Sequence, residues 1–210
     1  MQSSITGNTE NFFKNAYNSL PLSEARKKSL TSIAKKAAEE LNHGNPVNFN
    51  FICTHNSRRS QLCQVWAHFA THHFKLKNIA LFSGGTAVTS FFRNTVKTLQ
   101  EVGFIFHLSA FSHKNPTYLI TNDGHDSSLL AFSKLVDDAT NKKPFFAITT
   151  CNNADENCPF IPEAIHRFHL PFIDPKAYDD TDLQEDKYME TNRQVAAEMY
   201  FLFSSVSKLI

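Results

Sequence analysis

A polar loop between an apolar strand pattern and a helical pattern constrains this chain more than any other feature. The run Asn48–Ile52 is typical of a short strand, and the next residue is Cys53. Apolar residues then recur at steps of three and four over 60–74, which predicts a helix. Because N–H groups of such a loop and of the helix N-terminus point at the same spot, the sequence predicts an anion site there.

The rest of the chain continues this alternation of strand and helix patterns. Strands are predicted over 79–83 and 145–150, with a helix over 91–102 between them. A long loop from Cys151 to Ala177 and an amphipathic helix over 185–205 complete the chain. Such alternation is typical of an α/β fold with a parallel sheet and right-handed crossovers.

Residues 1–46 form an N-terminal helical extension ahead of this pattern. A helix over 23–41 is predicted, with Ser23 as its N-cap, and a shorter helix over 10–17 precedes it. These helices either cap the core or offer a surface to a partner. The remaining residues, 47–210, are expected to form one domain.

An insertion over 112–144 interrupts the alternation inside that domain. Strand patterns over 117–121 and 128–133 flank Asn122-Asp-Gly124, which predicts a β-hairpin. A helix over 127–139 is the competing interpretation.

Composition excludes several classes of function. The 210 residues carry a net charge of +1, which favours neither nucleic acid nor an anionic membrane as a partner. No apolar run approaches a membrane span, and the first twenty residues lack a signal-peptide pattern. The four cysteines are therefore expected to be reduced thiols in a cytoplasmic protein rather than a disulfide framework.

Cys53 and Arg59 are the expected chemical centre of the loop. The field at the helix N-terminus favours thiolate over thiol, so Cys53 should be nucleophilic near neutral pH. The Arg59 guanidinium can hold a tetrahedral oxyanion through two parallel N–H bonds. Arg58 would add a second cation, and Ser60 would act as N-cap, thiolate support or both. The expected anion-binding residues are Thr54, His55, Asn56, Ser57, Arg58, Arg59 and Ser60.

Two further cysteines, Cys151 and Cys158, stand seven residues apart in a polar segment. In a regular helix their sulfurs would be too far apart to bond, so a disulfide requires a loop or local unwinding. The separation is longer than that typical of structural zinc, and we expect no bound metal. Taken alone, the pair could also be two unrelated, half-buried thiols. The fourth thiol, Cys63, has apolar neighbours at helical spacing and is interpreted as a packed core residue.

Four segments in order resemble the low-molecular-weight protein tyrosine phosphatase superfamily, which includes the thioredoxin-coupled arsenate reductases. They are Cys-Thr-His-Asn-Ser-Arg-Arg-Ser-Gln from Cys53, Phe82-Ser-Gly-Gly-Thr86 with the helix after it, Phe146-Ala-Ile-Thr-Thr-Cys151, and Ile173-Asp-Pro175. Together they span about residues 47–205. The resemblance implies a three-layer fold in which helices flank a mainly parallel four-stranded sheet.

The resemblance also implies roles for individual residues. Asp174 corresponds to the general acid of the late Asp-Pro motif. The segment Cys151-Asn-Asn-Ala-Asp-Glu-Asn-Cys158-Pro is similar to the cysteine pair of the reductases, in which three cysteines work in series and an external thioredoxin restores them. No tightly bound cofactor is implied. Gln64 stands where reductases often carry a glutamate, which argues against the potassium site of some relatives.

Three functions follow as hypotheses. The first is a thioredoxin-dependent arsenate reductase that uses Cys53, Arg59, Asp174, Cys151 and Cys158. The second is a phosphatase that acts on phosphotyrosine or a small phosphoester through a phosphocysteine. The segment Asp174-Pro-Lys-Ala-Tyr178 lacks the run of aromatic residues that follows Asp-Pro in tyrosine phosphatases, which weakens the phosphotyrosine hypothesis. The third is a non-catalytic module that binds anions or phosphoproteins.

Overall fold

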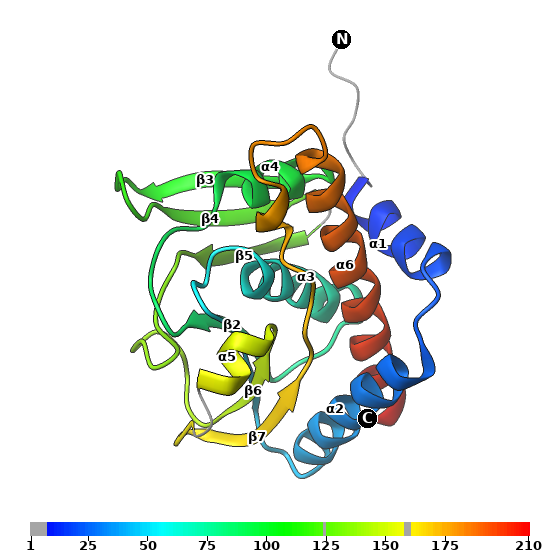
Figure 1. Ribbon diagram of the computed structural model, residues 1–210. Helices are drawn as coiled ribbons and strands as arrows, with labels where there is room; N and C mark the ends of the chain where they lie inside the picture. The colour runs from blue at the N-terminus through cyan, green and yellow to red at the C-terminus, as the bar shows by residue number, and fades with distance from the viewer. Residues whose placement is uncertain (1–7, 124, 158–160) are drawn as a thin grey trace.

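A parallel four-stranded sheet forms the centre of the molecule, as the sequence predicted (Figure 1). The computed structural model describes residues 8–123, 125–157 and 161–210. The strand order is β2-β1-β6-β7, with every neighbouring pair parallel. The strands are β1 (Val47–Cys53), β2 (Ile79–Gly85), β6 (Phe145–Thr149) and β7 (Ala164–His169).

The two faces of the sheet are covered by different layers. Phe49 and Phe51 of β1 belong to the main hydrophobic core, which the long helices cover. Ile52 belongs to a smaller buried cluster on the other face, which includes Ala154 and Ile161. Because both faces are covered, all seven residues of β1 are buried, as expected for a central parallel strand.

Five helices accompany the main core, and their positions agree with the predicted helices. The last helix, α6, contacts α1, α2, α3 and α4, so it joins the N-terminal extension to the rest of the fold. Ser23 caps α2, accepting a hydrogen bond from the N–H of Arg26 over 3.2 Å. The helices are α1 (Asn8–Ser19), α2 (Glu24–Asn42), α3 (Arg59–His73), α4 (Arg93–Glu101) and α6 (Gln184–Leu209).

The insertion forms strands rather than the competing helix, so the predicted hairpin is confirmed. Strands β4 (Thr117–Asn122) and β5 (His125–Ala131) pair antiparallel. A third strand, β3 (Phe104–Ala110), pairs with β4 and begins eight residues before the predicted boundary at 112. The resulting small sheet, β3-β4-β5, lies beside α4 at one end of the molecule (Figure 1).

The prediction of one long loop over 151–177 is wrong. The segment contains the short helix α5 (Asn152–Asn157), strand β7 and the 3₁₀ helix η1 (Pro175–Tyr178). Strand β7 is Ala-Ile-His-Arg-Phe-His, whose two histidines and arginine obscure the strand signal. It pairs with the fully buried β6, and this pairing makes it the fourth strand of the sheet.

Within the described residues, no helix is both long and apolar enough to span a bilayer.

Candidate active site

Buried hydrogen bonds hold the loop that follows β1. Asn56 lies in the left-handed region at φ 45°, and its side chain is completely buried. Its Nδ2 donates to Ser60 Oγ over 2.9 Å, and Ser60 Oγ lies 3.0 Å from Cys53 Sγ. Because the amide nitrogen of Asn56 can only donate, the hydroxyl hydrogen of Ser60 is left to point at the sulfur. The chain from Asn56 through Ser60 to Cys53 therefore supports a thiolate.

Two residues of the segment 112–144 form hydrogen bonds with this loop. Asn56 Oδ1 accepts from the N–H of Lys134 over 2.9 Å, and Ser133 Oγ donates to the carbonyl of His55 over 3.0 Å. Gln61 also joins the loop to this segment. Its Nε2 donates to the carbonyl of Asn56 over 3.1 Å and to that of Phe132 over 3.0 Å. The loop is therefore held by residues that follow β5 as well as by its own helix.

Two adjacent glycines of β2 allow the loop and the segment after β5 to pack closely against this strand. A Cβ on Gly85 would lie 2.8 Å from the N of Asn56, and one on Gly84 would lie 2.6 Å from the Cα of Val136. Because backbone atoms cannot move aside cheaply, any larger residue at either position would displace the loop or the segment after β5. The Ser-Gly-Gly sequence at the end of β2 thus has a packing reason.

Arg59 and Asp174, predicted as clamp and general acid, lie in direct contact. Arg59 Nη2 donates to Asp174 Oδ2 over 2.6 Å, and its Nη1 donates to the carbonyl of Phe172 over 3.3 Å. The other oxygen of Asp174 accepts from the N–H of Lys176 over 3.1 Å, so Asp174 caps η1. The fold therefore brings together two residues that are 115 positions apart in the chain.

The expectation that Arg58 adds a second cation to the anion site does not agree with its contacts. Arg58 is only 8% exposed. Its Nη2 donates to Asp179 Oδ2 over 2.7 Å, and its Nε donates to Tyr188 Oη over 2.6 Å. These partners draw the side chain away into the protein, because a buried guanidinium needs a carboxylate and acceptors around it.

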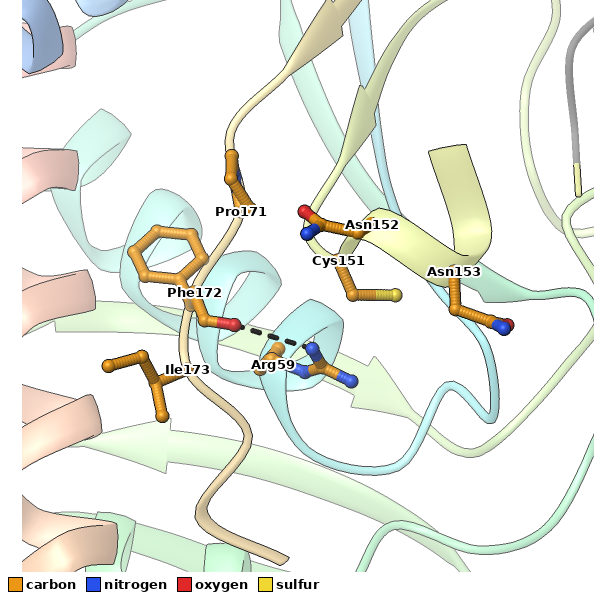
Figure 2. A pocket seen from close by; sticks show the side chains of 7 residues that line it. All are labelled: Arg59, Cys151, Asn152, Asn153, Pro171, Phe172 and Ile173. Atoms are coloured by element: carbon orange, nitrogen blue, oxygen red, sulfur yellow. Dashed lines mark hydrogen bonds between the residues drawn. The ribbon is translucent and has the colours of Figure 1, made fainter. Parts of the chain in front are cut away.

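Cys151 lies beside the loop, at the start of α5. Its Sγ is 3.6 Å from Thr54 Oγ1 and accepts from the N–H of Ala154 over 3.4 Å. Cys151 is 3% exposed, yet it lines one pocket with Arg59, as Figure 2 shows. Helix α5 and the loop thus place a second thiol beside Thr54 of the loop that follows β1. Its expected partner, Cys158, lies outside the described residues.

A polar cluster anchors α5 to β7. Asp155 Oδ1 accepts from Arg167 Nη2 over 2.7 Å and from Thr149 Oγ1 over 2.8 Å. His169 reaches the same helix, with its Nε2 3.1 Å from Asn152 Oδ1. Burial acts to raise the pKa of Asp155, but the hydrogen bonds from Arg167 and Thr149 outweigh burial and hold this pKa below its usual value. The carboxylate is therefore the charged anchor of the helix that follows Cys151.

The remaining thiol, Cys63, is packed in the core. It is completely buried on α3, and burial raises its pKa well above the usual range. Such a thiol stays protonated and unreactive near neutral pH. One position further along the chain, Gln64 accepts from Ser83 Oγ over 2.6 Å and donates to the carbonyl of Leu81 over 3.0 Å, so both ends of its amide are used. Over the described ranges there is no cluster of three or more histidine, cysteine, aspartate or glutamate side chains fit to hold a metal.

The sequence did not reveal several residues of the site. Ser133 and Lys134 act through the loop, and Asp179 and Tyr188 hold Arg58. None of the four belongs to a motif, and each is joined to the loop only by the tertiary fold. Asn153, whose Oδ1 accepts from Thr54 Oγ1 over 3.0 Å, follows Cys151 closely and could have been suspected from that position.

Comparison with known proteins shows which proteins this chain resembles. No family model matches the chain. An arsenate reductase of Staphylococcus aureus (strain Newman) is 28% identical over 125 residues, which cover 60% of this chain and 76% of that protein. An arsenate reductase of Bacillus subtilis (strain 168) is 26% identical over 159 residues, covering 75% and 95%.

Solved structures show the same fold. A low-molecular-weight phosphotyrosine phosphatase from Vibrio cholerae O395 superposes with a TM-score of 0.51 at 14% identity, covering 76% of this chain and 95% of that one. A low-molecular-weight protein tyrosine phosphatase from T. tengcongensis gives a TM-score of 0.50 at 13% identity, covering 75% and 98%.

The fold is that of the low-molecular-weight protein tyrosine phosphatases, in agreement with the resemblance that the motifs indicated. The sequence is similar to those of arsenate reductases. These sequence relatives are named as enzymes, and the prediction that this chain is an enzyme is confirmed.

Proposed function

We propose that this protein is an arsenate reductase that transfers electrons through a relay of three cysteines. The observation that carries the proposal is the position of Cys151, whose sulfur lies 3.6 Å from the hydroxyl of Thr54 in the anion loop. Hydrolysis of a phosphocysteine needs no second thiol at the loop. A thiol there is what reduction requires.

The first step forms a bond between Cys53 and arsenic. The anion takes the place of Asp174 as the partner of Arg59, because a tetrahedral oxyanion accepts two parallel bonds from the guanidinium. Cys53 thiolate then attacks arsenic and one oxygen leaves. Asp174, released from Arg59, takes up a proton from water and gives it to that oxygen as general acid, so that the oxygen leaves as water.

The second step transfers the electrons. Cys151 thiolate attacks Cys53 Sγ, a sulfur–sulfur bond forms, and the electron pair of the sulfur–arsenic bond goes to arsenic. As(V) thereby becomes As(III), and arsenite leaves with Cys53 and Cys151 joined. The N–H of Ala154 supports the attacking sulfur, since it donates to Cys151 Sγ. Thr54 Oγ1 donates to Asn153, so it can accept the thiol hydrogen of Cys151 before ionisation.

The last step restores Cys53. Cys158 thiolate attacks Cys151 and the disulfide moves to the pair 151–158, which an external thioredoxin reduces by thiol–disulfide exchange. Cys158 enters this scheme from the sequence motif alone. A relay that begins with three reduced thiols suits the reducing cytoplasm, where we place the protein.

The test is arsenite release with thioredoxin, its reductase and NADPH as the electron source. We expect turnover in the wild type, none in Cys151→Ser, and near wild-type turnover in Cys63→Ala as the matched cysteine control. In a single turnover without thioredoxin, one equivalent of arsenate should remove two thiols per chain. Arsenite release that persists in Cys151→Ser would exclude the relay.

Phosphoester hydrolysis is the second candidate, because the ion pair of Arg59 and Asp174 provides clamp and acid for that reaction too. Aryl phosphate turnover that survives Cys151→Ser, with no arsenite formed by the wild type, would replace the reductase proposal with this one.

A further inference from the structure

Arg58, Asp179 and Tyr188 form a closed ring of hydrogen bonds behind the anion loop. Arg58 donates to Asp179 Oδ2 over 2.7 Å and to Tyr188 Oη over 2.6 Å. Tyr188 Oη in turn donates to Asp179 Oδ1 over 2.6 Å. The Arg58 guanidinium also lies 3.8 Å from the centre of the Phe92 ring, so both its edge and its face are occupied.

The ring is largely buried, and burial fixes the protonation state of its phenol. The exposed fractions of the Arg58 and Asp179 side chains are 10% and 20%, and Tyr188 is 1% exposed. Burial and then the hydrogen bond to Asp179 raise the pKa of Tyr188 far above its usual value. The phenol therefore stays protonated. Its O–H donates a hydrogen bond to Asp179, and its oxygen accepts one from Arg58. Each of the three side chains is thus hydrogen-bonded to the other two.

The ring is attached to one end of η1, and Asp174 stands at the other end. Asp174 is the N-cap of η1 and Asp179 is its C-cap. Two consecutive arginines of the loop thus hold the two ends of one 3₁₀ turn, Arg59 through Asp174 and Arg58 through Asp179. The Asp174 contact must break when an anion takes Arg59, but the Asp179 contact need not.

We propose that Arg58 is a positioning residue that keeps the general acid over the loop after Arg59 has turned to the substrate. It acts through Asp179 and η1 rather than by touching the anion. This inference rests on the proposed function in one respect, namely that Asp174 is the proton donor of the first step.

The test separates this role from anion binding through the split between kcat and KM. In Arg58→Met we expect kcat for arsenite release to fall at least about tenfold, a part of the contribution of general acid catalysis. KM for arsenate should stay within about twofold, because a positioning residue makes no contact with the anion. In Arg58→Lys we expect kcat to stay close to that of Arg58→Met, since a lysine cannot bond both Asp179 and Tyr188 in the plane of the ring. Arg93→Met, at an exposed arginine of α4, is the matched control.

A double substitution excludes a merely structural role. Adding Arg58→Met to Asp174→Asn should cost less than about a further twofold in kcat, because the acid that Arg58 positions is already gone. Losses that multiply, or a raised KM at unchanged kcat, would overturn the proposal. If Arg58→Met does not fold, Tyr188→Phe serves instead, since it removes only one hydroxyl from the ring.

A measurement without turnover keeps this proposal separate from the proposed function. In Cys53→Ser protein, amide hydrogen exchange over 175–181 should become at least about fivefold faster on adding Arg58→Met, while phosphate affinity is unchanged. If amide exchange over 175–181 does not change, the positioning role of Arg58 is overturned, even if the enzyme reduces arsenate. If the wild type releases no arsenite but hydrolyses an aryl phosphate, the same kcat and KM comparison applies to that substrate.

Discussion

Arg59 and Asp174 neutralise each other in the free site, with Nη2 of the arginine 2.6 Å from Oδ2 of the aspartate. The side chains are 14% and 32% exposed, so the pair lies at the rim rather than in the interior. Substrate therefore competes with a carboxylate of the protein for its clamp. Binding of the anion and release of the acid become one event.

Asp174→Asn should consequently bind anions more tightly and turn over more slowly. Removing the competing charge at a partly exposed pair should tighten phosphate binding by about three- to tenfold. Loss of the acid should lower kcat about a hundredfold. Calorimetric titration with phosphate and the arsenite assay measure the two effects. Asp182→Asn, which removes the same charge from an exposed turn, should change neither, and weaker phosphate binding in Asp174→Asn would contradict the competition.

Cys63 should be chemically silent. Because burial raises the pKa of its thiol, Cys63 should stay unlabelled by iodoacetamide in native protein from pH 7 to 9, while denatured protein is labelled. The raised pKa also means that its contribution to stability is complete below the unfolded pKa and declines as pH rises above it. Cys63→Ala should keep arsenite release and lose about 1 kcal/mol of unfolding free energy. Native labelling detected by peptide mass spectrometry would contradict the core assignment.

Asp155 should control access to Cys151. In a Cys53→Ser background, Asp155→Asn should speed the reaction of Cys151 with dithiodipyridine about tenfold at pH 7, since α5 loses its charged anchor on β7. The depressed pKa of Asp155 contributes stability above its unfolded pKa that is lost as pH falls through the folded one. The difference between variant and parent should therefore shrink below about pH 4. Glu156→Gln, at the exposed neighbour on α5, should leave the labelling rate of Cys151 as in the parent. If the rate difference between Asp155→Asn and the parent is independent of pH, the carboxylate of Asp155 is not its cause.

Arg26 should matter for stability more than its place in the N-terminal extension suggests. Its Nη2 lies 2.8 Å from Oε2 of Glu198, whose side chain is 1% exposed, and its guanidinium lies 4.7 Å from the Phe172 ring. Arg26→Met leaves a buried carboxylate unpaired and should cost about 3 kcal/mol in urea unfolding. The double variant Arg26→Met with Glu198→Leu should recover most of that loss. Arg193→Met, at an exposed arginine of α6, is the control. A double variant no more stable than Arg26→Met would rule out the unpaired charge as the cause.

The sequence predicted the elements whose patterns are local. The strand ending at Cys53, the Ser23 cap and the helix after the loop depend on periodicity and capping, which neighbouring residues determine. Strand β7 was missed because its identity depends on pairing with β6, and its own residues carry charge and imidazole groups. Strand β3 was missed although Phe104-Ile-Phe follows Gly103 directly, a boundary that a strand signal could have used.

The site divides in the same way. The contact of Ser60 with Cys53 was expected from their spacing within one loop and helix, and the structure has it, with Sγ and Oγ 3.0 Å apart. Arg58 was expected to face the anion because its neighbour does. Its direction is set instead by Asp179 and Tyr188, which are 121 and 130 residues away in the chain, and no local pattern contains that information.

The contacts of Ser133 and Lys134 with the loop have a consequence for the ancestry of this protein. An insertion that hung free of the site could be lost or exchanged without harm, as surface loops often are. Here the residues just after β5 form hydrogen bonds with His55 and Asn56 themselves. The small sheet and the loop are thus expected to be inherited together, and transplanting the loop alone into another protein would leave Asn56 Oδ1 without the N–H of Lys134.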